Sequence, residues 1–372
     1  MKIIRLLSRI LIGLVFIFSG TVKAIDPLGS AYKFHDYFQA FHLGFLNELC
    51  LVLSVMLCTT EFIAGFSVLT GLWHKAGTWL AFLLMIIFTP LTLVLAITNP
   101  VSDCGCFGDA IHLSNWQTFG KNIVLLAAAL ILLRGMKTVK TNLKAGTGPV
   151  SIALAAILLV LFSFYNLRYL PLIDFLPYKT GVRIAEKMAV PEGAPSDIYN
   201  TTFIYEKNGV RKEFNLSDYP ANDTSWKFVD QKSVLIRKGY HPPIHDFSIV
   251  RLDGEDLTQR ILADTGYSVL MVSKKLPEAG IKNLTEGFEF GRFCVGNGIR
   301  YYVLTASGTD EAKKYDNGLD FCTVDETTLK TMIRANPGYI LLHQGVIIGK
   351  WSKAGLPGRE WFIERTRHRQ AT

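Results

Sequence analysis

The sequence predicts an α-helical membrane bundle followed by a water-soluble α/β domain. Up to about Leu170 the chain is dominated by Leu, Ile, Val, Phe and Ala, whereas the rest has the composition of a soluble protein. Five apolar stretches in the first part are long enough to cross a hydrocarbon core about 30 Å thick. In the last third, strand and helix patterns alternate, which is typical of an α/β sheet.

These patterns divide the 372 residues into four parts. We expect a four-helix transmembrane domain over 1–135, a basic cytoplasmic loop with a fifth transmembrane helix over 136–170, a β-rich connector over 171–239 and the α/β domain over 240–372. The formal net charge of +8 comes largely from short segments that flank the apolar stretches. Basic residues there hold loops against anionic lipid, so the charge indicates the lipid bilayer as a partner and does not indicate nucleic acid.

The membrane spans and their direction follow from hydropathy and charge. The predicted spans are Leu6–Val22, Leu46–Leu69, Thr78–Ile97, Phe119–Leu133 and Val150–Tyr165. Each must be helical, because only a helix satisfies its own backbone polar groups in lipid. Basic residues precede the first, third and fifth spans, so the N-terminus is expected in the cytoplasm and the C-terminal domain in the periplasm of a bacterial inner membrane. A cleaved signal peptide ending near Ala24 is the alternative, and it would leave the domain on the same side.

The sharpest motif is Asp103-Cys104-Gly105-Cys106-Phe107-Gly108-Asp109, in the loop between the third and fourth spans. Two cysteines one residue apart can close a small, strained disulfide, and strain makes such a bond easier to reduce. The expected location is an oxidising compartment, where a disulfide can persist. The alternatives are a tight turn in which both thiols merely pack, or a disulfide that only stiffens the loop. No metal site is predicted, since the nearby His112 completes no common zinc spacing.

A polar stripe marks the second span. On a helix, these residues fall within roughly 80° of one another: Cys50, Ser54, Cys58, Glu61 and Gly65. An ionisable residue at mid-membrane normally faces the bundle interior with a partner, and Lys23 is the predicted partner of Glu61. Cys50 is expected at the depth of Cys104 and Cys106, so that the three thiols could meet. Cys58 is predicted to be a packing residue, and Glu61 a proton carrier or part of a quinone site.

Two segments of the membrane half resemble known proteins. The first span, from Gly13 to Lys23, resembles the opening helix of the DoxX family. The loop Cys104-Gly105-Cys106-Phe107-Gly108 resembles the MauE branch of that superfamily, the methylamine utilisation membrane proteins. The likeness covers roughly residues 1–135. It implies a four-helix bundle associated with maturation of a disulfide-rich periplasmic partner, comparable with quinone-linked membrane proteins that generate disulfides.

The soluble half begins with a hairpin and ends in an α/β pattern. Residues 201–214 alternate around Asn208-Gly209, which predicts a hairpin with no evident chemistry. From Pro243 onwards the expected elements make a three-layer α/β sheet: strands at 246–249, 253–258 and 268–272, a helix to about 293, a strand at 301–305, a short helix, a strand at 320–324, a helix at 326–335, and strands at 339–343 and 346–351.

Residues 240–360 resemble the thioredoxin-like fold, in its membrane-anchored TlpA and peroxiredoxin-type branch. The opening Asp246-Phe247 hairpin and the strand-turn-strand unit after Pro337 carry this resemblance, which places Pro337 where that fold keeps a cis-proline. The family's redox CxxC would follow the strand at 268–272, but Ser273-Lys274-Lys275-Leu276 stands there. We therefore do not expect ordinary dithiol exchange in this domain. Cys294 and Cys322 are interpreted as a buried pair, the alternative being a relocated redox couple.

These observations predict a redox-associated inner-membrane protein of the DoxX/MauE type that supports maturation of a periplasmic client. The candidate catalytic residues are Cys104, Cys106, Cys50 and Glu61, and Glu61 with Lys23 is the candidate quinone site. A non-enzymatic assembly factor, anchored by the bundle and binding through the soluble domain, is the second hypothesis, and the missing CxxC favours it. A transporter is disfavoured, because the short-looped spans contain no broken repeats.

Overall fold

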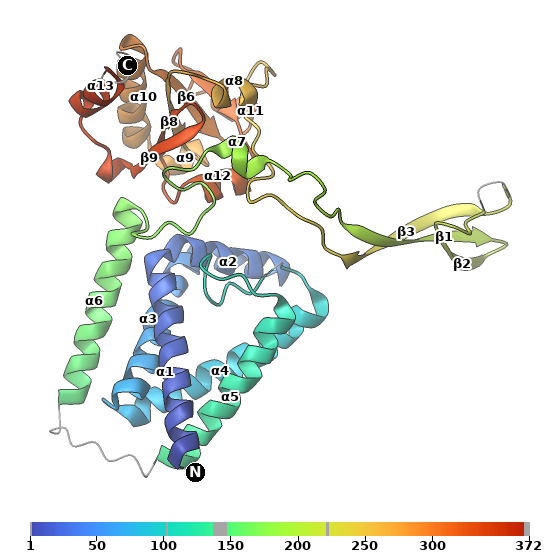
Figure 1. Cartoon of the computed structure of the whole chain (residues 1–372), viewed down its shortest axis with the longest axis vertical. Helices are drawn as coiled ribbons and strands as arrows, with labels where there is room; N and C mark the ends of the chain where they lie inside the picture. Colours follow the sequence, from blue (N-terminus) through green and yellow to red (C-terminus); the bar gives the residue numbers. More distant parts are fainter. Residues whose placement is uncertain (1, 102, 137–146, 221–222, 368–372) are drawn as a thin grey trace. The chain divides into compact units, whose positions relative to one another are not determined.

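The computed structural model of the chain describes residues 2–101, 103–136, 147–220 and 223–367, which form two compact units (Figure 1). The first unit joins Met1–Val182 to Ser248–Thr372 and contains the helical bundle and an α/β domain. The second unit, Arg183–Phe247, contains a three-stranded sheet. In the sequence, the second unit is therefore inserted into the first.

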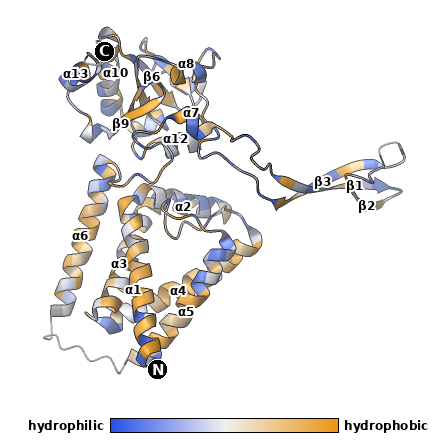
Figure 2. Ribbon diagram, in the orientation of Figure 1, coloured by the Kyte–Doolittle hydropathy of each residue, from blue (hydrophilic) through white to orange (hydrophobic). Residues whose placement is uncertain are grey.

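The described residues contain five helices that are long and apolar enough to cross a membrane. They are α1 (Lys2–Ile25), α3 (Cys50–Thr70, preceded by the 3-10 helix η1, Gly44–Leu49), α4 (His74–Thr98), α5 (Asn115–Gly135) and α6 (Thr147–Tyr169). Each predicted span lies within one of them, which confirms a multi-pass membrane protein. These helices are largely hydrophobic (Figure 2). Large apolar side chains such as Leu14, Ile87 and Leu158 are exposed on them, as expected of helices that face lipid.

One further helix of the bundle, α2 (Pro27–Ala40), is not predicted by the hydropathy pattern. The side chain of Asp26 caps its first turn by accepting a hydrogen bond from the backbone N–H of Gly29, and Pro27 occupies the first helical position. Both residues are favoured there, because the cap satisfies a free N–H and proline has none to lose. Helix α2 runs across the ends of α1 and α3 (Figure 1) and supplies side chains to the candidate site described below.

Glycines allow α1 and α3 to cross closely. A Cβ atom on Gly65 would lie 2.7 Å from the backbone nitrogen of Ile17, and one on Gly20 would lie 2.6 Å from the carbonyl oxygen of Cys58. Small residues at such a crossing let two membrane helices approach to backbone contact. The crossing brings the end of α1 beside the middle of α3.

We expect the substitution Gly65→Leu to lower the free energy of unfolding of the bundle by about 1–3 kcal/mol, because the added side chain must push two helix backbones apart. Thermal unfolding of the detergent-solubilised protein measures the loss. The control is Gly120→Leu, the same change on α5, where a Cβ atom meets no other atom within 4 Å. Equal thermal unfolding midpoints for Gly65→Leu and Gly120→Leu would contradict close packing at Gly65.

The α/β domain is built on a six-stranded sheet with the order β4-β7-β6-β5-β8-β9. Its strands are β4 (Val250–Arg251), β5 (Tyr267–Val272), β6 (Arg300–Thr305), β7 (Asp320–Thr323), β8 (Gly338–His343) and β9 (Val346–Ser352). Strands β5, β6 and β7 are parallel, whereas β4, β8 and β9 run antiparallel to their neighbours. The predicted strands from 268 onwards are confirmed.

Helices cover both faces of this sheet. They are α8 (Thr258–Leu262), α9 (Leu276–Ala279), α10 (Ile281–Gly296), α11 (Thr309–Lys313), α12 (Glu326–Met332) and α13 (Arg359–Arg367), with the 3-10 helix η3 (Lys353–Gly355) after β9. On one face, Phe290 of α10 and Phe362 of α13 pack on Tyr339. On the other, the alternate strand residues Leu270 and Ile340 are also fully buried. A mixed α/β domain is therefore confirmed.

The structure corrects three of the elements predicted for this domain. The strands expected at 246–249 and 253–258 are wrong, because only β4 and one bridge between Val250 and Asp256 form. The side chains of Asp253 and Asp256 instead accept hydrogen bonds from backbone N–H groups two residues later, which favours turns over strands. Helix α12 ends at Met332, before the predicted 335. The bond between Asn336 and Pro337 is cis, as the resemblance implied.

Cys294 and Cys322 are both fully buried, as predicted, but they are free thiols and do not form the predicted pair. Cys294 packs in the same cluster as Phe321, the neighbour of Cys322 on β7. Because successive strand residues point to opposite faces, the two sulfurs lie on opposite sides of the sheet. Burial raises the pKa of each thiol to about 12, so neither is a ready nucleophile. This argues against a relocated redox couple.

The second unit contains α7 (Ile184–Met188) and the sheet β2-β1-β3. Its strands, all antiparallel, are β1 (Ile198–Lys207), β2 (Val210–Asn215) and β3 (Lys227–Arg237). Asn208 and Gly209 form the predicted turn, both with positive φ (53° and 77°), which confirms the hairpin. Strand β3, which the sequence pattern does not predict, is exposed along its whole length.

Candidate functional site

The motif at 103–109, here named the dithiol loop, holds its two thiols close together. The sulfurs of Cys104 and Cys106 are 3.1 Å apart and unbonded. A disulfide needs about 2.05 Å, so oxidation of the two thiols can form the bond with only a small movement of the sulfurs. Gly105 between them has a φ of +65°, and a Cβ atom there would lie 2.8 Å from the Cγ of Lys33. The loop therefore requires glycine for both its backbone conformation and its packing.

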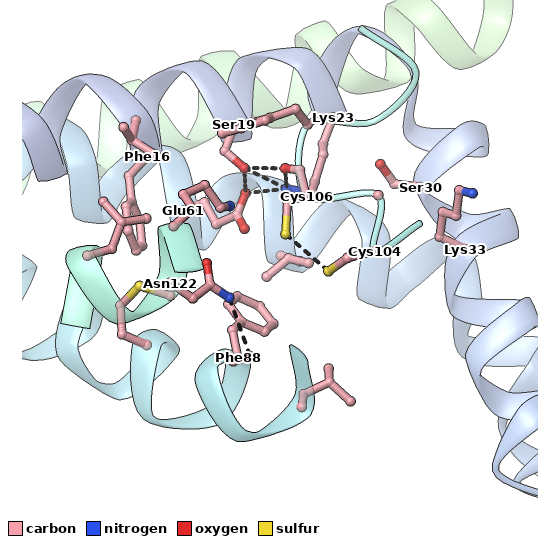
Figure 3. Close-up of a pocket in the computed structure, with 18 of the residues that line it drawn as sticks. Phe16, Ser19, Lys23, Ser30, Lys33, Glu61, Phe88, Cys104, Cys106 and Asn122 are labelled. Atoms are coloured by element: carbon pink, nitrogen blue, oxygen red, sulfur yellow. Dashed lines mark hydrogen bonds and ion pairs between the residues drawn. The ribbon is translucent and has the colours of Figure 1, made fainter. Parts of the chain in front are cut away.

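A buried ion pair inside the bundle holds the carbonyl of Cys106 (Figure 3). Lys23 Nζ of α1 donates to Glu61 Oε2 of α3 at 2.8 Å and to the Cys106 carbonyl oxygen at 2.6 Å. Ser19 Oγ lies 2.8 Å from Glu61 Oε2 and 2.7 Å from the same carbonyl. The side chains of Lys23 and Glu61 are only 5% and 8% exposed. The predicted ion pair of Lys23 with Glu61 is confirmed. Through Lys23, it connects the interior of the bundle to the dithiol loop.

Helix α2 holds the other end of the loop. Tyr37 Oη donates to the carbonyl of Cys104 at 2.5 Å, and Lys33 Nζ donates to Asp103 Oδ2 at 3.1 Å. Burial alone would raise the pKa of Asp103, but hydrogen bonds and charge from His112 and Lys33 lower it to about 2. Asp103 is therefore ionised at neutral pH and remains a fixed anchor.

The two thiols of the loop are electrostatically unequal. With the thiol of Cys104 as donor, their hydrogen bond stabilises the Cys106 thiolate, and the ammonium groups of Lys121 and Lys23 add to this. These interactions hold the pKa of Cys106 below its ordinary value, although burial opposes them. The same hydrogen bond and burial raise the pKa of Cys104. These electrostatics favour the thiolate, which is the reactive form, at Cys106 rather than at Cys104.

Lys121, on α5, is a site residue that the sequence argument misses. Its Nζ lies 4.5 Å from the centre of the Phe107 ring, and its side chain lines the same cavity as the thiols. Across the described residues, no carboxylate lies within ion-pair distance of it. A lysine within an otherwise apolar span is the signal that could have identified it, since such residues usually serve a function.

These groups surround a cavity of about 100 Å³ within the bundle (Figure 3). Its apolar walls are Val15, Phe16, Phe34, Leu57, Met85, Phe88, Leu91, Phe107 and Leu125. Its polar lining is Ser19, Lys23, Ser30, Lys33, Tyr37, Glu61, Cys104, Cys106, Lys121 and Asn122. Within the described part of the chain, Ser30 Oγ and Asn122 Oδ1 are buried without a hydrogen-bond partner. Buried polar atoms normally have a partner, so these two are free to bind a ligand.

The other cysteines of the bundle lie elsewhere. Cys50, at the start of α3, is buried but does not line the cavity, and no contact joins its sulfur to the dithiol loop in the described structure. Cys58 is fully buried beside Ala24 and Leu159, as expected of a packing residue. The structure therefore brings together Cys104, Cys106, Glu61 and Lys23, and leaves Cys50 outside the site.

Two segments of the chain match known families. Residues 1–135 match the sequence model of the family described as Methylamine utilisation protein MauE, and residues 199–238 match that of a Domain of unknown function (DUF8463). No curated protein matches the chain. The first match spans α1 to α5 and includes the dithiol loop and the charged groups around it. The membrane domain that carries the candidate site is therefore similar to MauE proteins, as its loop motif implied.

Proposed function

We propose that this protein is a thiol–disulfide oxidoreductase of the membrane, in which Cys104 and Cys106 alternate between a dithiol and a disulfide. The observation that carries the proposal is a pair of unequal thiols, 3.1 Å apart, at the wall of a cavity in the bundle. A client dithiol reduces the loop disulfide by thiol–disulfide exchange and leaves as a disulfide. The loop dithiol then gives two electrons and two protons to a quinone, which becomes the quinol.

The cavity suits a quinone head group as the electron acceptor. The rings of Phe16, Phe34 and Phe88 provide flat apolar walls. Lys121 can donate to a carbonyl oxygen, and the unpartnered Asn122 Oδ1 can accept from a hydroxyl. The lining therefore offers hydrogen-bond partners to both the quinone and the quinol.

The ion pair provides a place for the released protons. Glu61 is the carboxylate of the cavity lining and accepts hydrogen bonds from Lys23 and Ser19. Ser19 also contacts the backbone of Cys106, so the network reaches from the dithiol loop to the middle of α3. In this proposal Glu61 takes up one of the two protons released as the thiols are oxidised and passes it on to the quinone, and Lys23 keeps the carboxylate oriented.

The placement of the site in the cell follows the charge pattern. Basic residues flank the opposite ends of the spans from the dithiol loop, which supports an inner-membrane protein with its loop and C-terminal domain in the periplasm. The client is then a periplasmic protein with cysteines. The name of the matching family refers to methylamine utilisation, and a client of that process is one form of the proposal.

The C-terminal domain is interpreted as thioredoxin-like without redox chemistry of its own. The parallel strands β5 to β7 beside antiparallel β8 and β9, and the cis bond before Pro337, support this fold. Lys274 is buried where that fold would carry a cysteine. This observation favours the second candidate function, a non-enzymatic assembly factor whose bundle only anchors the chain.

The redox state of Cys104 and Cys106 in living cells tests the proposal. Acid quenching, differential alkylation and mass spectrometry give the oxidised fraction with the quinone pool oxidised or fully reduced. We expect a mixed population that shifts to the dithiol when quinol oxidation is blocked, while the buried thiol of Cys294 stays reduced throughout. A pair that remains in one state under both conditions would refute redox cycling and favour the assembly factor.

A further inference from the structure

A buried arginine of the α/β domain joins two acidic residues of the bundle. Arg334, which follows α12, is 5% exposed. Its Nε donates to Asp26 Oδ2 at 2.8 Å, and its Nη2 donates to Asp109 Oδ2 at 2.5 Å. Asp109 is the last residue of the dithiol loop, and Asp26 is the cap of α2. A single guanidinium group therefore contacts both structures that fix the position of the thiols.

The surface around Arg334 is already occupied by α2. The ring of Tyr32 lies 5.0–5.3 Å from the charged groups of Lys274, Lys330 and Arg334, as in cation–π contacts. Lys274 Nζ also donates to the hydroxyl of Tyr32. Burial, with the charges of Arg334 and Lys330, lowers the pKa of Lys274 to about 8. The partner of the desolvated ammonium group of Lys274 is thus Tyr32, a residue of the same chain.

A second set of contacts joins the end of α6 to β9. Ser352 Oγ donates to the carbonyl of Arg168 at 2.6 Å, and Lys350 Nζ pairs with Asp174 at 2.6 Å. The side chain of Lys350 is only 7% exposed. The Lys350 contacts lie close to Arg334, since Asp174, Arg334 and Lys350 line the same pocket, and they add a second link between the domain and the bundle.

We propose that Arg334 is a positioning residue for the dithiol loop, and that the docked α/β domain keeps the two thiols closed over the cavity. The loop has two anchors besides the ion pair at Lys23: α2 at its start and Asp109 at its end. Arg334 binds both. Without the guanidinium, the buried carboxylate of Asp26 and the partly buried carboxylate of Asp109 would both lose their ion pair, which is unfavourable. The loop then opens, and the thiols, which are only partly exposed in the closed loop, become more accessible.

This inference concerns the geometry of the loop and goes beyond the proposed redox cycle, since it holds whether or not the thiols turn over. It also assigns a role to a domain without CxxC. The face of the domain that carries Lys274 and Arg334 binds the bundle of its own chain, so a periplasmic client has no access to that face while the domain is docked.

The test is the alkylation rate of each cysteine in the reduced, full-length protein in nanodiscs, followed by mass spectrometry. We expect Arg334→Gln to accelerate labelling of Cys104 and Cys106 by roughly tenfold or more, as local opening becomes cheaper. Arg334→Lys, which keeps one ion pair, should give an intermediate rate. Asp109→Asn should reproduce the effect on the loop while leaving the ion pair of Arg334 with Asp26.

Two controls separate loop opening from unfolding. Arg300→Gln also deprives a buried carboxylate, Asp264, of its arginine, but within the α/β domain, and it should leave the loop rates unchanged. Cys294 and Cys322 report unfolding of the domain, and they should stay protected in every variant. Unchanged loop rates in both Arg334→Gln and Asp109→Asn would overturn the inference. If Arg334→Gln exposes Cys294, Asp109→Asn alone decides: faster loop labelling supports positioning, and an unchanged rate refutes it.

Discussion

Lys23→Met should lower the unfolding free energy of the bundle by about 3–5 kcal/mol, the usual cost of leaving a buried charge without its partner. Glu61 would lose its ion pair at 2.8 Å, and the Cys106 carbonyl would lose a donor at 2.6 Å. Unfolding of the purified protein in detergent by heat or denaturant measures this loss.

The double variant Lys23→Met with Glu61→Leu separates stability from function. Replacing a buried ion pair by apolar residues of similar size is often neutral or stabilising, so the unfolding free energy should return close to that of the native protein. The redox response to the quinone pool should not return, since the proton-accepting carboxylate is absent. A double variant that still cycles as the native protein does would show that Glu61 carries no proton. A double variant as unstable as Lys23→Met alone would contradict the coupling of the pair.

Cys104→Ala should move the pH dependence of Cys106 labelling strongly upward. In the native protein, the labelling midpoint should lie well below the ordinary thiol value of about 8.5, because the hydrogen bond from Cys104 stabilises the thiolate. Without that donor, burial dominates and raises the pKa of Cys106. Only the thiolate reacts, so the variant is slow at neutral pH and gains reactivity as the pH rises. Rates measured from pH 5 to 10 give the midpoint independently of steric access.

Lys121→Met provides a graded comparison. Loss of one nearby cation should raise the midpoint for Cys106 by on the order of one pH unit, less than Cys104→Ala does. Lys121→Arg keeps the charge and should leave the midpoint in place. If Cys104→Ala and Lys121→Met both give the native labelling midpoint, the two thiols are not coupled in this way, and Cys106 is not the nucleophile of the pair.

The sequence predicts the bundle well, because membrane spans are set by the length and composition of single stretches. The Lys23–Glu61 pair is predictable for a related reason: a carboxylate in lipid needs a partner, and few cations are near enough. Helix α2 escapes prediction because its face is only moderately apolar. Its beginning at Asp26-Pro27 is nevertheless a recognisable cap and first turn.

The parts that escape prediction depend on contacts between distant residues. Lys121 acquires its role only when the ring of Phe107 and the thiol of Cys106 fold against it. Arg334 binds partners 308 and 225 positions away, and no local pattern connects them. Cys50 shows the opposite error, because its position along α3 does not predict which neighbour it faces.

The position of Arg334 near the end of the chain has a consequence for biosynthesis. Asp109 leaves the ribosome 225 residues before the arginine that covers it, an interval of roughly 10–45 s at about 5–20 residues per second. During that time the new dithiol loop has its membrane anchors but lacks its cover. Enzymes that oxidise or reduce nascent proteins can therefore reach the thiols before the final contact forms. The contact with Arg334 therefore forms last in assembly. The initial redox state of Cys104 and Cys106 is set before that contact forms.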